Sequence, residues 1–407
     1  MQDLETSVRQ YADSAAFREA LGIPREEALC LSKLAQGECN VNFLLERPGD
    51  KKKLVLRVNL VSQMHLSNQV GYEYAALSAL SESGRTPKPL YLDSTAQIAE
   101  GERIGNGLMV YEYLPGRPLS YRTDLLRAAE LLADIHSCPY LVPDSSPQVS
   151  QQASLVTVSS SLRVNQQASP VTASSSLQAS PYTSPCSAQP QHYMVQATAL
   201  PKKEASGIRL IEAHSPLRMI LEECTEMFKT YQNAEIADRD VRKRIETMLE
   251  AGYARFADSV SEGNCRCIIN TELNSGNFLM NDGGRDYLID WEKPLLGAPA
   301  QDLGHFLAPT TTLWKTDVLL TEDETARFVK EYLRAAAGRI DTEGLSEALQ
   351  CFLPVTCLRG LTWSAMAWVQ YQDPASKAPK NRDTWNKLCS YLSADFLDLI
   401  EKRYFSD

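Results

Sequence analysis

Three oxygen-bearing side chains stand close together in the segment 265–291. Glu272 and Asn277 follow an apolar, β-branched run, and Asp290 ends a later apolar run. Phosphoryl transfer from a nucleotide requires a carboxylate at the acceptor hydroxyl and oxygen ligands for Mg²⁺, which usually takes few protein ligands. The residue types and their spacing therefore favour this chemistry, with Glu272 at the hydroxyl and Asn277 and Asp290 on the metal.

The sequence around these residues reads as a strand followed by a hairpin. The first strand is predicted at 265–269, and two more at 278–280 and 287–289 enclose an Asn-Asp-Gly-Gly turn at 281–284. Such a turn is a strong hairpin signal. The alternative is that the Asn and Asp side chains only cap turns, as they often do. The chemical interpretation is favoured because all three side chains fall in the loop and at the mouth of one hairpin.

At these positions the sequence resembles the aminoglycoside phosphotransferase and choline kinase family, small-molecule kinases with a protein-kinase-like fold. The family pattern is His-x-Asp-x-x-x-x-Asn, followed by Ile-Asp-Trp-Glu or a similar run. This chain has Asn270, Glu272 and Asn277 in the first pattern and Ile-Asp-Trp-Glu at 289–292. It differs at Asn270, where His is usual, and at Glu272, where Asp is usual. The resemblance implies that Asn270 and Glu272 belong to the catalytic loop, and that ATP or GTP with Mg²⁺ is the co-substrate.

A glycine between two predicted strands lies near the N-terminus. Taken alone, Gly37 is more typical of an ordinary hairpin turn than of a nucleotide-binding loop. Family members read Gly-Gly-x-x-Asn at this place, where this chain has Gln36, Gly37 and Asn40. The resemblance therefore implies that these three residues belong to a loop whose backbone N–H groups cover the nucleotide phosphates.

Four further residues are expected at the nucleotide. Arg57 ends the third apolar run of the chain, and Glu73 lies in a helix predicted at 69–80. Both side chains could also be ordinary solvated charges. The resemblance implies instead that Arg57 reaches the phosphates and pairs with Glu73. It also implies that the backbone at Glu112 and Tyr113, which end a later predicted strand, contacts adenine.

Composition narrows the class of protein. A net charge of −10 over 407 residues argues against a broad nucleic-acid surface, and it mildly favours a cationic acceptor. The N-terminus lacks the pattern of a secretory signal, and the longest apolar stretch, 351–369, contains Arg359 and reads as a buried helix rather than a membrane span. The ten cysteines include no C-x-x-C pair, and Cys265 and Cys267 are expected to be buried on one side of a strand rather than to bind a metal. We therefore expect a cytoplasmic location and no membrane partner.

The domain organisation follows from a change of composition within the chain. Residues 1–113 are predicted to form an N-terminal lobe with a small antiparallel sheet and one helix. Residues 114–407 are predicted to form a mostly helical lobe that carries the catalytic loops. Within it, 141–206 is rich in Ser, Gln, Thr and Pro and holds a fifteen-residue repeat. This segment cannot bury enough apolar surface to offset its ordering entropy, so a disordered insertion is predicted.

The remaining elements are mostly helices. Apolar periodicity and capping signals predict helices at 1–28, 69–80, 125–136, 217–231, 234–260, 300–306, 322–337, 342–372 and 383–404, and a loop at 291–299. Asp302, at the start of one of these helices, is expected to brace the catalytic loop. Trp314, Trp363 and Trp368 fall where family members build the acceptor pocket, although each is more typical of the core.

Two functions remain open at this point. The first is a kinase that moves the γ-phosphoryl group of ATP or GTP to a hydroxyl of a small molecule. Only eleven residues separate Asp290 from Asp302, too few for the activation segment of a protein kinase. The second is a nucleotide-binding or scaffold protein of the same fold with impaired catalysis, which the departures at Asn270 and Glu272 motivate.

Overall fold

The computed structural model describes residues 4–37, 39–99, 102–140, 208–257, 265–373 and 381–406. The segment 141–206, for which the sequence predicts a disordered insertion, lies outside the described residues. Glu38 in the predicted phosphate loop is also outside them.

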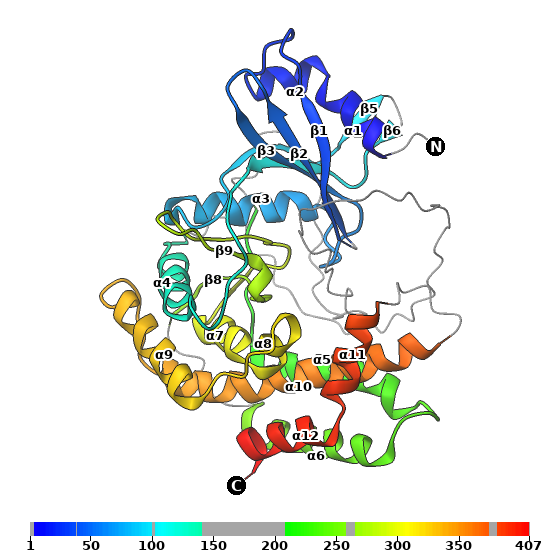
Figure 1. The fold of residues 1–407 in the computed structure, drawn as a ribbon, viewed down its shortest axis with the longest axis vertical. Helices are drawn as coiled ribbons and strands as arrows, with labels where there is room; N and C mark the ends of the chain where they lie inside the picture. Colours follow the sequence, from blue (N-terminus) through cyan, green and yellow to red (C-terminus); the bar gives the residue numbers. More distant parts are fainter. Residues whose placement is uncertain are drawn as a thin grey trace, which may run out of the picture.

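A five-stranded antiparallel sheet in the order β1-β2-β3-β7-β4 forms the part of the molecule nearest the N-terminus (Figure 1). The strands are β1 Cys30–Gln36, β2 Asn40–Arg47, β3 Lys52–Asn59, β4 Pro89–Asp93 and β7 Leu108–Glu112, with a small hairpin of β5 Gln97–Ala99 and β6 Glu102–Arg103. Helices α1 (Leu4–Ala12) and α2 (Ala15–Ala20) share a buried apolar cluster with one face of the sheet. Helix α3 (Gln69–Leu80) lies against β4 and β7.

The period-two alternation of β3 separates its apolar and polar side chains. Leu56 and Val58 enter the apolar cluster shared with α1 and α2. Arg57 and Asn59 point to the opposite face because successive strand side chains alternate. On β2, the residue paired with Asn59 is Asn40. The polar residues of both strands are therefore collected on the face turned toward the helical part of the molecule.

The second part of the molecule is mostly helical. Its helices are α4 Leu125–His136, α5 Pro216–Gln232, α6 Arg239–Phe256, α7 Pro299–Leu307, α8 Pro309–Lys315, α9 Glu322–Ala336, α10 Leu345–Gln372, α11 Arg382–Tyr391 and α12 Ala394–Ile400, with a π-helical turn η4 at Glu401–Phe405. The long helix α10 packs along α5 and against α7 (Figure 1). Within the described ranges, no helix is both long enough and apolar enough to cross a membrane.

The helix predicted at 1–28 is wrong, because the segment forms the two helices α1 and α2, and Ser14 caps the second by accepting a hydrogen bond from Phe17 N–H. Two further helix predictions are wrong at their ends. The helix predicted at 383–404 is broken, because Ser393 caps a new helix by accepting a hydrogen bond from Phe396 N–H. The helix predicted to begin at 234 begins at Arg239, where Asp238 accepts from two backbone N–H groups. In both cases a short polar side chain satisfies the unpaired donors of a helix start. The predicted capping box of α9, Thr321 with Glu324, is present.

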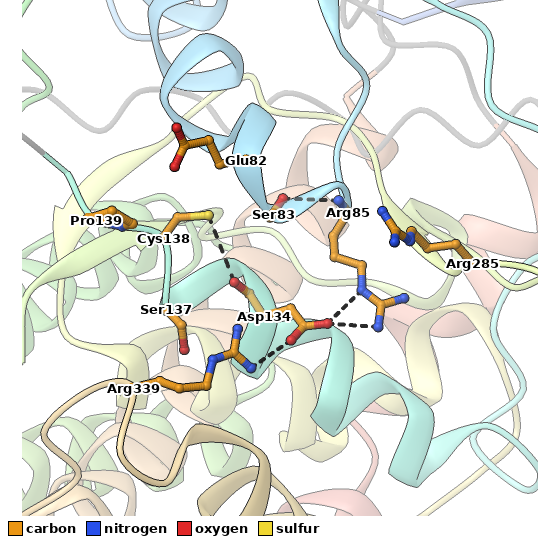
Figure 2. Close-up of a pocket in the computed structure, with 9 residues that line it drawn as sticks. All are labelled: Glu82, Ser83, Arg85, Asp134, Ser137, Cys138, Pro139, Arg285 and Arg339. Carbon is orange, nitrogen blue, oxygen red and sulfur yellow. Dashed lines mark hydrogen bonds and ion pairs between the residues drawn. The ribbon is translucent and has the colours of Figure 1, made fainter.

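Arginines from distant segments meet at the C-terminal end of α4 (Figure 2). Asp134 accepts from Arg85 Nε at 2.7 Å and from Arg339 Nη1 at 2.7 Å. Arg85 follows η1 (Ser81–Ser83), and Arg339 follows α9. These contacts border a cavity of about 260 Å³, and they tie the end of α3 and its following turn to the helical part of the molecule.

The predicted hairpin is formed by β9 (Phe278–Leu279) and β10 (Tyr287–Leu288). The strand β8 (Cys267–Ile269) does not join it but pairs with β11, Leu295–Gly297. The expected loop at 291–299 therefore contains a strand, and this part of the prediction is wrong. The run Leu295-Leu296-Gly297 is too short for a period-two pattern to separate it from a loop.

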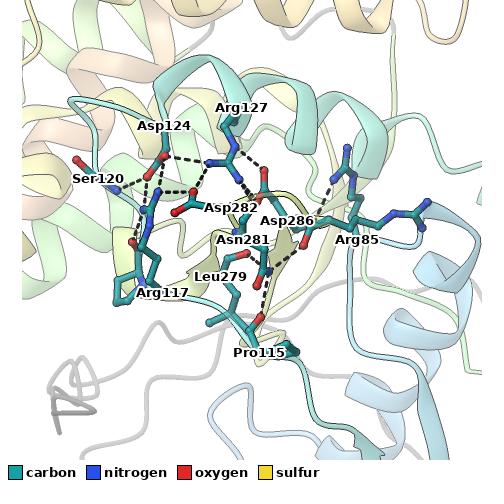
Figure 3. Close-up of polar contacts among 12 residues, drawn as sticks. Arg85, Pro115, Arg117, Ser120, Asp124, Arg127, Leu279, Asn281, Asp282 and Asp286 are labelled. Carbon is teal, nitrogen blue, oxygen red and sulfur yellow. Dashed lines mark hydrogen bonds and ion pairs between the residues drawn. The ribbon is translucent and has the colours of Figure 1, made fainter. Parts of the chain in front are cut away.

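A polar network fixes the hairpin to α4 (Figure 3). Arg127 donates to Asp286 Oδ1 at 2.5 Å and to Asn281 O at 2.7 Å. Asn281 N–H in turn donates to Asp286 Oδ1 at 2.8 Å. Before α4, Arg117 donates to Asp124 Oδ2 at 2.6 Å. The closed end of the hairpin is thereby anchored, which fixes its open end, where Asn277 and Asp290 lie.

Candidate active site

Asn270 joins the two segments that carry the predicted catalytic and metal residues. Its side chain is buried, donates from Nδ2 to Asp290 O at 2.9 Å, and accepts at Oδ1 from Glu272 N–H at 3.1 Å. A buried amide that satisfies both its donor and its acceptor in this way fixes the two backbones relative to each other. Asn270 is therefore a positioning residue at a place where family members have His.

Asp302 in the first turn of α7 braces the same loop. It accepts from Asn270 N–H at 2.8 Å and from Thr271 N–H at 2.8 Å, one bond to each carboxylate oxygen. His136 Nε2 lies 3.2 Å from Asp302 Oδ2. Thr271 has a φ of 71°, in the left-handed region. The brace thus holds the loop in a conformation that a β-branched residue adopts at a cost.

Glu272 forms an ion pair with Lys293, a residue that the sequence analysis did not select. Burial alone raises the pKa of the Glu272 carboxyl, but the cation of Lys293 more than offsets it, so this pKa lies below its usual range. Glu272 is therefore ionised at neutral pH. The sequence signal for Lys293 is its position directly after the Ile-Asp-Trp-Glu run.

The predicted pair of Arg57 and Glu73 is formed. Arg57 Nε donates to Glu73 Oε2 at 3.0 Å, and both side chains are buried. The same guanidinium donates from Nη2 to Glu292 Oε1 at 2.5 Å and lies 3.6 Å from Asp290 Oδ1. Burial, reinforced by the neighbouring carboxylate of Glu292, raises the pKa of Asp290 to about 7, although Arg57 lowers it. Three carboxylates therefore surround one cation.

Glu292 was missed by sequence reasoning although it belongs to the Ile-Asp-Trp-Glu motif, because Asp290 was the only residue of that motif to which a role was assigned. Its Oε1 also accepts from Asn40 Nδ2 at 2.7 Å, and its carbonyl oxygen accepts from Gln69 Nε2 at 2.7 Å. Asn59 donates to Asn40 Oδ1 at 2.9 Å. The polar face of β2 and β3 is thus bound directly to the segment that follows Asp290.

Asn277 and Asp290 lie at the open end of the hairpin, just outside the paired residues Phe278 and Leu288. Asn277 donates from Nδ2 to Glu272 O at 2.8 Å, and its carbonyl oxygen accepts from Ile289 N–H at 2.8 Å. Because Nδ2 makes this bond, Oδ1 is the side-chain atom that could bind a metal. An amide oxygen and a carboxylate are hard donors that fit Mg²⁺. The described part of the chain contains no group of three or more His, Cys, Asp or Glu residues that could hold a metal alone, so phosphate and water oxygens would complete the site.

The predicted phosphate loop connects β1 and β2. Gly37 N–H donates to Asn40 O at 2.8 Å, which closes the turn. The side chain of Gln36 accepts from Lys33 on the same strand and is exposed. Of the three predicted loop residues, only Asn40 has a side chain that contacts the carboxylates around Arg57, through its bond to Glu292.

The predicted adenine contacts lie where β7 ends. Glu112 N–H donates to Lys88 O at 3.1 Å, and Tyr113 N–H donates to Lys53 O at 3.2 Å. Both N–H groups are therefore already used within the sheet part of the molecule. A base placed here would have to use other backbone groups of this stretch.

A cavity of about 140 Å³ adjoins Glu272. Two of the three tryptophans named from the sequence, Trp314 and Trp363, line it, whereas Trp368 is half-buried, packs against the core and does not line the cavity. The larger cavity of Figure 2 contains none of the predicted site residues. The smaller cavity is thus the one placed beside the candidate catalytic carboxylate.

Solved structures with a similar fold include three small-molecule kinases. A choline kinase from Cryptosporidium parvum has 10% sequence identity and a TM-score of 0.54, with 98% of this chain and 94% of that chain covered. An ethanolamine kinase from Plasmodium vivax has 13% identity and a TM-score of 0.53, with 97% and 89% covered. A spectinomycin phosphotransferase in complex with ADP and spectinomycin has 8% identity and a TM-score of 0.50, with 92% of each chain covered. These likenesses confirm the predicted kinase-like α+β fold.

The sequence itself was compared with family models and with curated proteins. No curated protein matched it. The model of the phosphotransferase enzyme family, abbreviated APH, matched residues 31–348. This match spans most of the chain and confirms the family resemblance that the catalytic and metal patterns indicated. The protein belongs to the phosphotransferase enzyme family.

Proposed function

We propose that this protein transfers the γ-phosphoryl group of ATP or GTP to a hydroxyl of a small molecule, with Mg²⁺. The observation that carries the proposal is the pair of hydrogen bonds that the side chain of Asn270 makes with Glu272 N–H and Asp290 O. It holds a carboxylate for the acceptor and an oxygen ligand for the metal in one fixed relation. Phosphoryl transfer depends mainly on such positioning and on electrostatic stabilisation.

Each residue of the site has a separate task in this proposal. The ionised carboxylate of Glu272 orients the acceptor hydroxyl and takes its proton as the hydroxyl oxygen bonds to the γ-phosphorus and the bond to the nucleoside diphosphate breaks. Asn277 and Asp290 hold the metal, and Arg57, paired with Glu73, faces the phosphates. Mg²⁺ held by these two residues would neutralise negative charge on the phosphates. The ADP named in the complex of the spectinomycin phosphotransferase supports a nucleotide co-substrate.

The short distance in sequence from Asp290 to Asp302 and the cavity beside Glu272 support a small acceptor rather than a protein. The alternative function is a nucleotide-binding protein of the same fold with impaired catalysis. From the sequence alone, Asn270 in place of the usual His supports this alternative. The structure weakens that support. The amide of Asn270 makes two hydrogen bonds that hold the loop, so the substitution does not leave the loop without support.

The test is nucleotide consumption in the presence of a broad panel of hydroxyl compounds, for the wild type and for Glu272→Gln. We expect Glu272→Gln to lower kcat by ~10²–10⁴, the usual span for a positioned acid–base group. The affinity for Mg-nucleotide should be unchanged, because Asn277 and Asp290 are intact. Equal rates in the two proteins would remove Glu272 from catalysis, and absent Mg-dependent nucleotide binding in the wild type would contradict the proposed function.

A further inference from the structure

The cavity beside Glu272 has a restricted size. It lies among the catalytic loop, α7, α8 and α10, and its volume is about 140 Å³. Pockets for drug-sized ligands measure roughly 300–1,000 Å³. The cavity therefore suits a molecule well below that size, with its reactive hydroxyl next to Glu272.

The charged side chains that line the cavity are already paired. Glu272 pairs with Lys293. Arg359 on α10 makes a two-fold contact with Glu223 on α5, at 2.9 Å from Nε and 3.1 Å from Nη2. Among the described residues that line the cavity, Glu272 is the only carboxylate. The described lining of the cavity therefore contains no unpaired carboxylate that could bind a cationic ligand.

His305 adds a donor but no charge. Burial, reinforced by the cation of Arg359, lowers the pKa of His305 to about 4. Its Nδ1 accepts from Leu273 N–H at 3.1 Å, so the ring proton of the neutral imidazole resides on Nε2. The side chain is thus a neutral hydrogen-bond donor in the wall of the cavity.

The remaining lining is uncharged and combines polar with aromatic groups. The hydroxyl residues Thr311 and Thr356 line it, and so does Gln63, whose buried Oε1 has no hydrogen-bond partner in the part of the chain that the structure describes. Trp314 and Trp363 meet edge to face, with ring centroids 5.2 Å apart. Dispersed polar groups beside aromatic rings match a ligand that is itself apolar on its carbon faces and hydroxylated at its edge.

We propose that the acceptor is an uncharged polyhydroxylated molecule, of the class of monosaccharides and polyols, and that the cavity rejects cationic amines; this inference rests on the proposed phosphotransferase function. A cation in the cavity would be desolvated without a free carboxylate, which is costly, and would lie near the positive charges of Arg359 and Lys293. The negative net charge of the whole chain, which mildly favours a cationic acceptor, does not predict this local balance.

The test compares ligands that differ only in charge. Glucose is paired with glucosamine, galactose with galactosamine, and choline with its uncharged carbon analogue that carries a tert-butyl group. Binding to the full chain is measured by calorimetry, with and without Mg-nucleotide, and phosphoryl transfer is then measured for each compound. We expect the uncharged member of at least one pair to bind at least about tenfold more tightly than the cationic member.

The inference would be overturned if, in every pair that shows binding, the cationic member bound at least as tightly as the uncharged member. It would also be overturned if no compound bound at millimolar concentration. The binding arm separates this inference from the proposed function. Sugar binding without nucleotide binding would contradict only the proposed function, whereas phosphoryl transfer solely to cationic compounds would contradict only the inference.

A variant changes the local charge directly. Arg359→Gln leaves the carboxylate of Glu223 unpaired behind the cavity wall, so we expect the preference to move toward the cationic member by about tenfold. The double variant Glu223→Gln/Arg359→Gln is the matched control, and it should retain the preference for the uncharged member. An unchanged preference in folded Arg359→Gln would overturn the argument from charge pairing. If that variant does not fold, the wild-type pairs and the double variant still decide the outcome.

Discussion

At the scale of single residues, the site depends on side chains that make two contacts at once. Asn270 contacts both the catalytic and the metal segment, and Arg57 contacts both Glu73 and Glu292. Residues of this kind cannot be replaced by a type that supplies only one of the two interactions. Their tests must therefore separate a role in position from a role in charge.

At saturating Mg-nucleotide, where metal binding keeps Asp290 ionised, Lys293 is expected to set the acid limb of the pH profile. Glu272 must be ionised to accept a proton, and its pKa is held below the usual range by Lys293 against the effect of burial. Activity is then present above this lowered pKa and is lost as the pH falls through it. Lys293→Met should move the acid limb of kcat to higher pH, because only the effect of burial remains. Lys293→Arg keeps the charge and should leave the limb nearly in place, and an unmoved limb in Lys293→Met would contradict the assignment.

For the two proposed metal ligands we expect different losses of nucleotide affinity. Asp290→Ala should abolish the Mg²⁺-dependent part of nucleotide binding, because it removes the ionisable ligand. Asn277→Ala should weaken it, since an amide oxygen contributes less than a carboxylate. Calorimetry of Mg-nucleotide binding measures both, with Asp282→Ala at the exposed closed end of the hairpin as control. An unchanged affinity in Asp290→Ala would remove this residue from the metal site.

At the scale of elements, α7 supplies the brace of the catalytic loop. Asp302→Ala would leave the buried N–H group of Asn270 and the half-buried N–H group of Thr271 without an acceptor. The expected loss of stability is about 2–4 kcal/mol, since each unsatisfied buried donor costs ~1–3 kcal/mol. Chemical denaturation measures it. Asp317→Ala removes an exposed carboxylate and should change stability little, and a similar loss in both variants would contradict the brace.

The elements that the sequence predicted best are those with a strong periodic signal. The predicted helix at 125–136 agrees with α4 at both ends, because apolar residues recur at helical spacing between polar flanking residues. The helix predicted at 69–80 also agrees with α3 at both ends, where the side chain of Asn68 caps the first turn. The helix predicted at 383–404 was wrong because Ser393 acts as an internal cap. The pairing of β8 with β11 could not be predicted, since it joins segments of three residues by long-range hydrogen bonds.

The candidate site was predicted unevenly for a similar reason. Arg57 with Glu73 could be inferred from a family pattern, and the structure brings the two together. Lys293 and Glu292 could not be assigned, because their contacts depend on how the sheet and the hairpin meet in space. The roles of Gln36, Gly37, Glu112 and Tyr113 at a nucleotide stay predictions.

At the scale of the whole molecule, composition predicts that the segment 141–206 contributes little to stability. Replacing 145–200 with a short Gly/Ser linker should leave the Tm nearly unchanged, because a segment so rich in Ser, Gln and Thr cannot bury much apolar surface. Differential scanning calorimetry of the two proteins is the measurement. A large drop in Tm would mean that the segment packs on the remainder of the protein.

The left-handed backbone of Thr271 has a consequence for how the protein can vary. A β-branched residue at a φ of 71° is unfavourable by ~1–3 kcal/mol, and it is held there by its bonds to Asp302 and to Lys293 O. Substitution by Asn or Gly would relax the backbone but release the hydroxyl contact with the segment that carries the partner of Glu272. At this position we therefore expect a trade-off between stability and activity. A substitution that raises thermal stability should lower turnover.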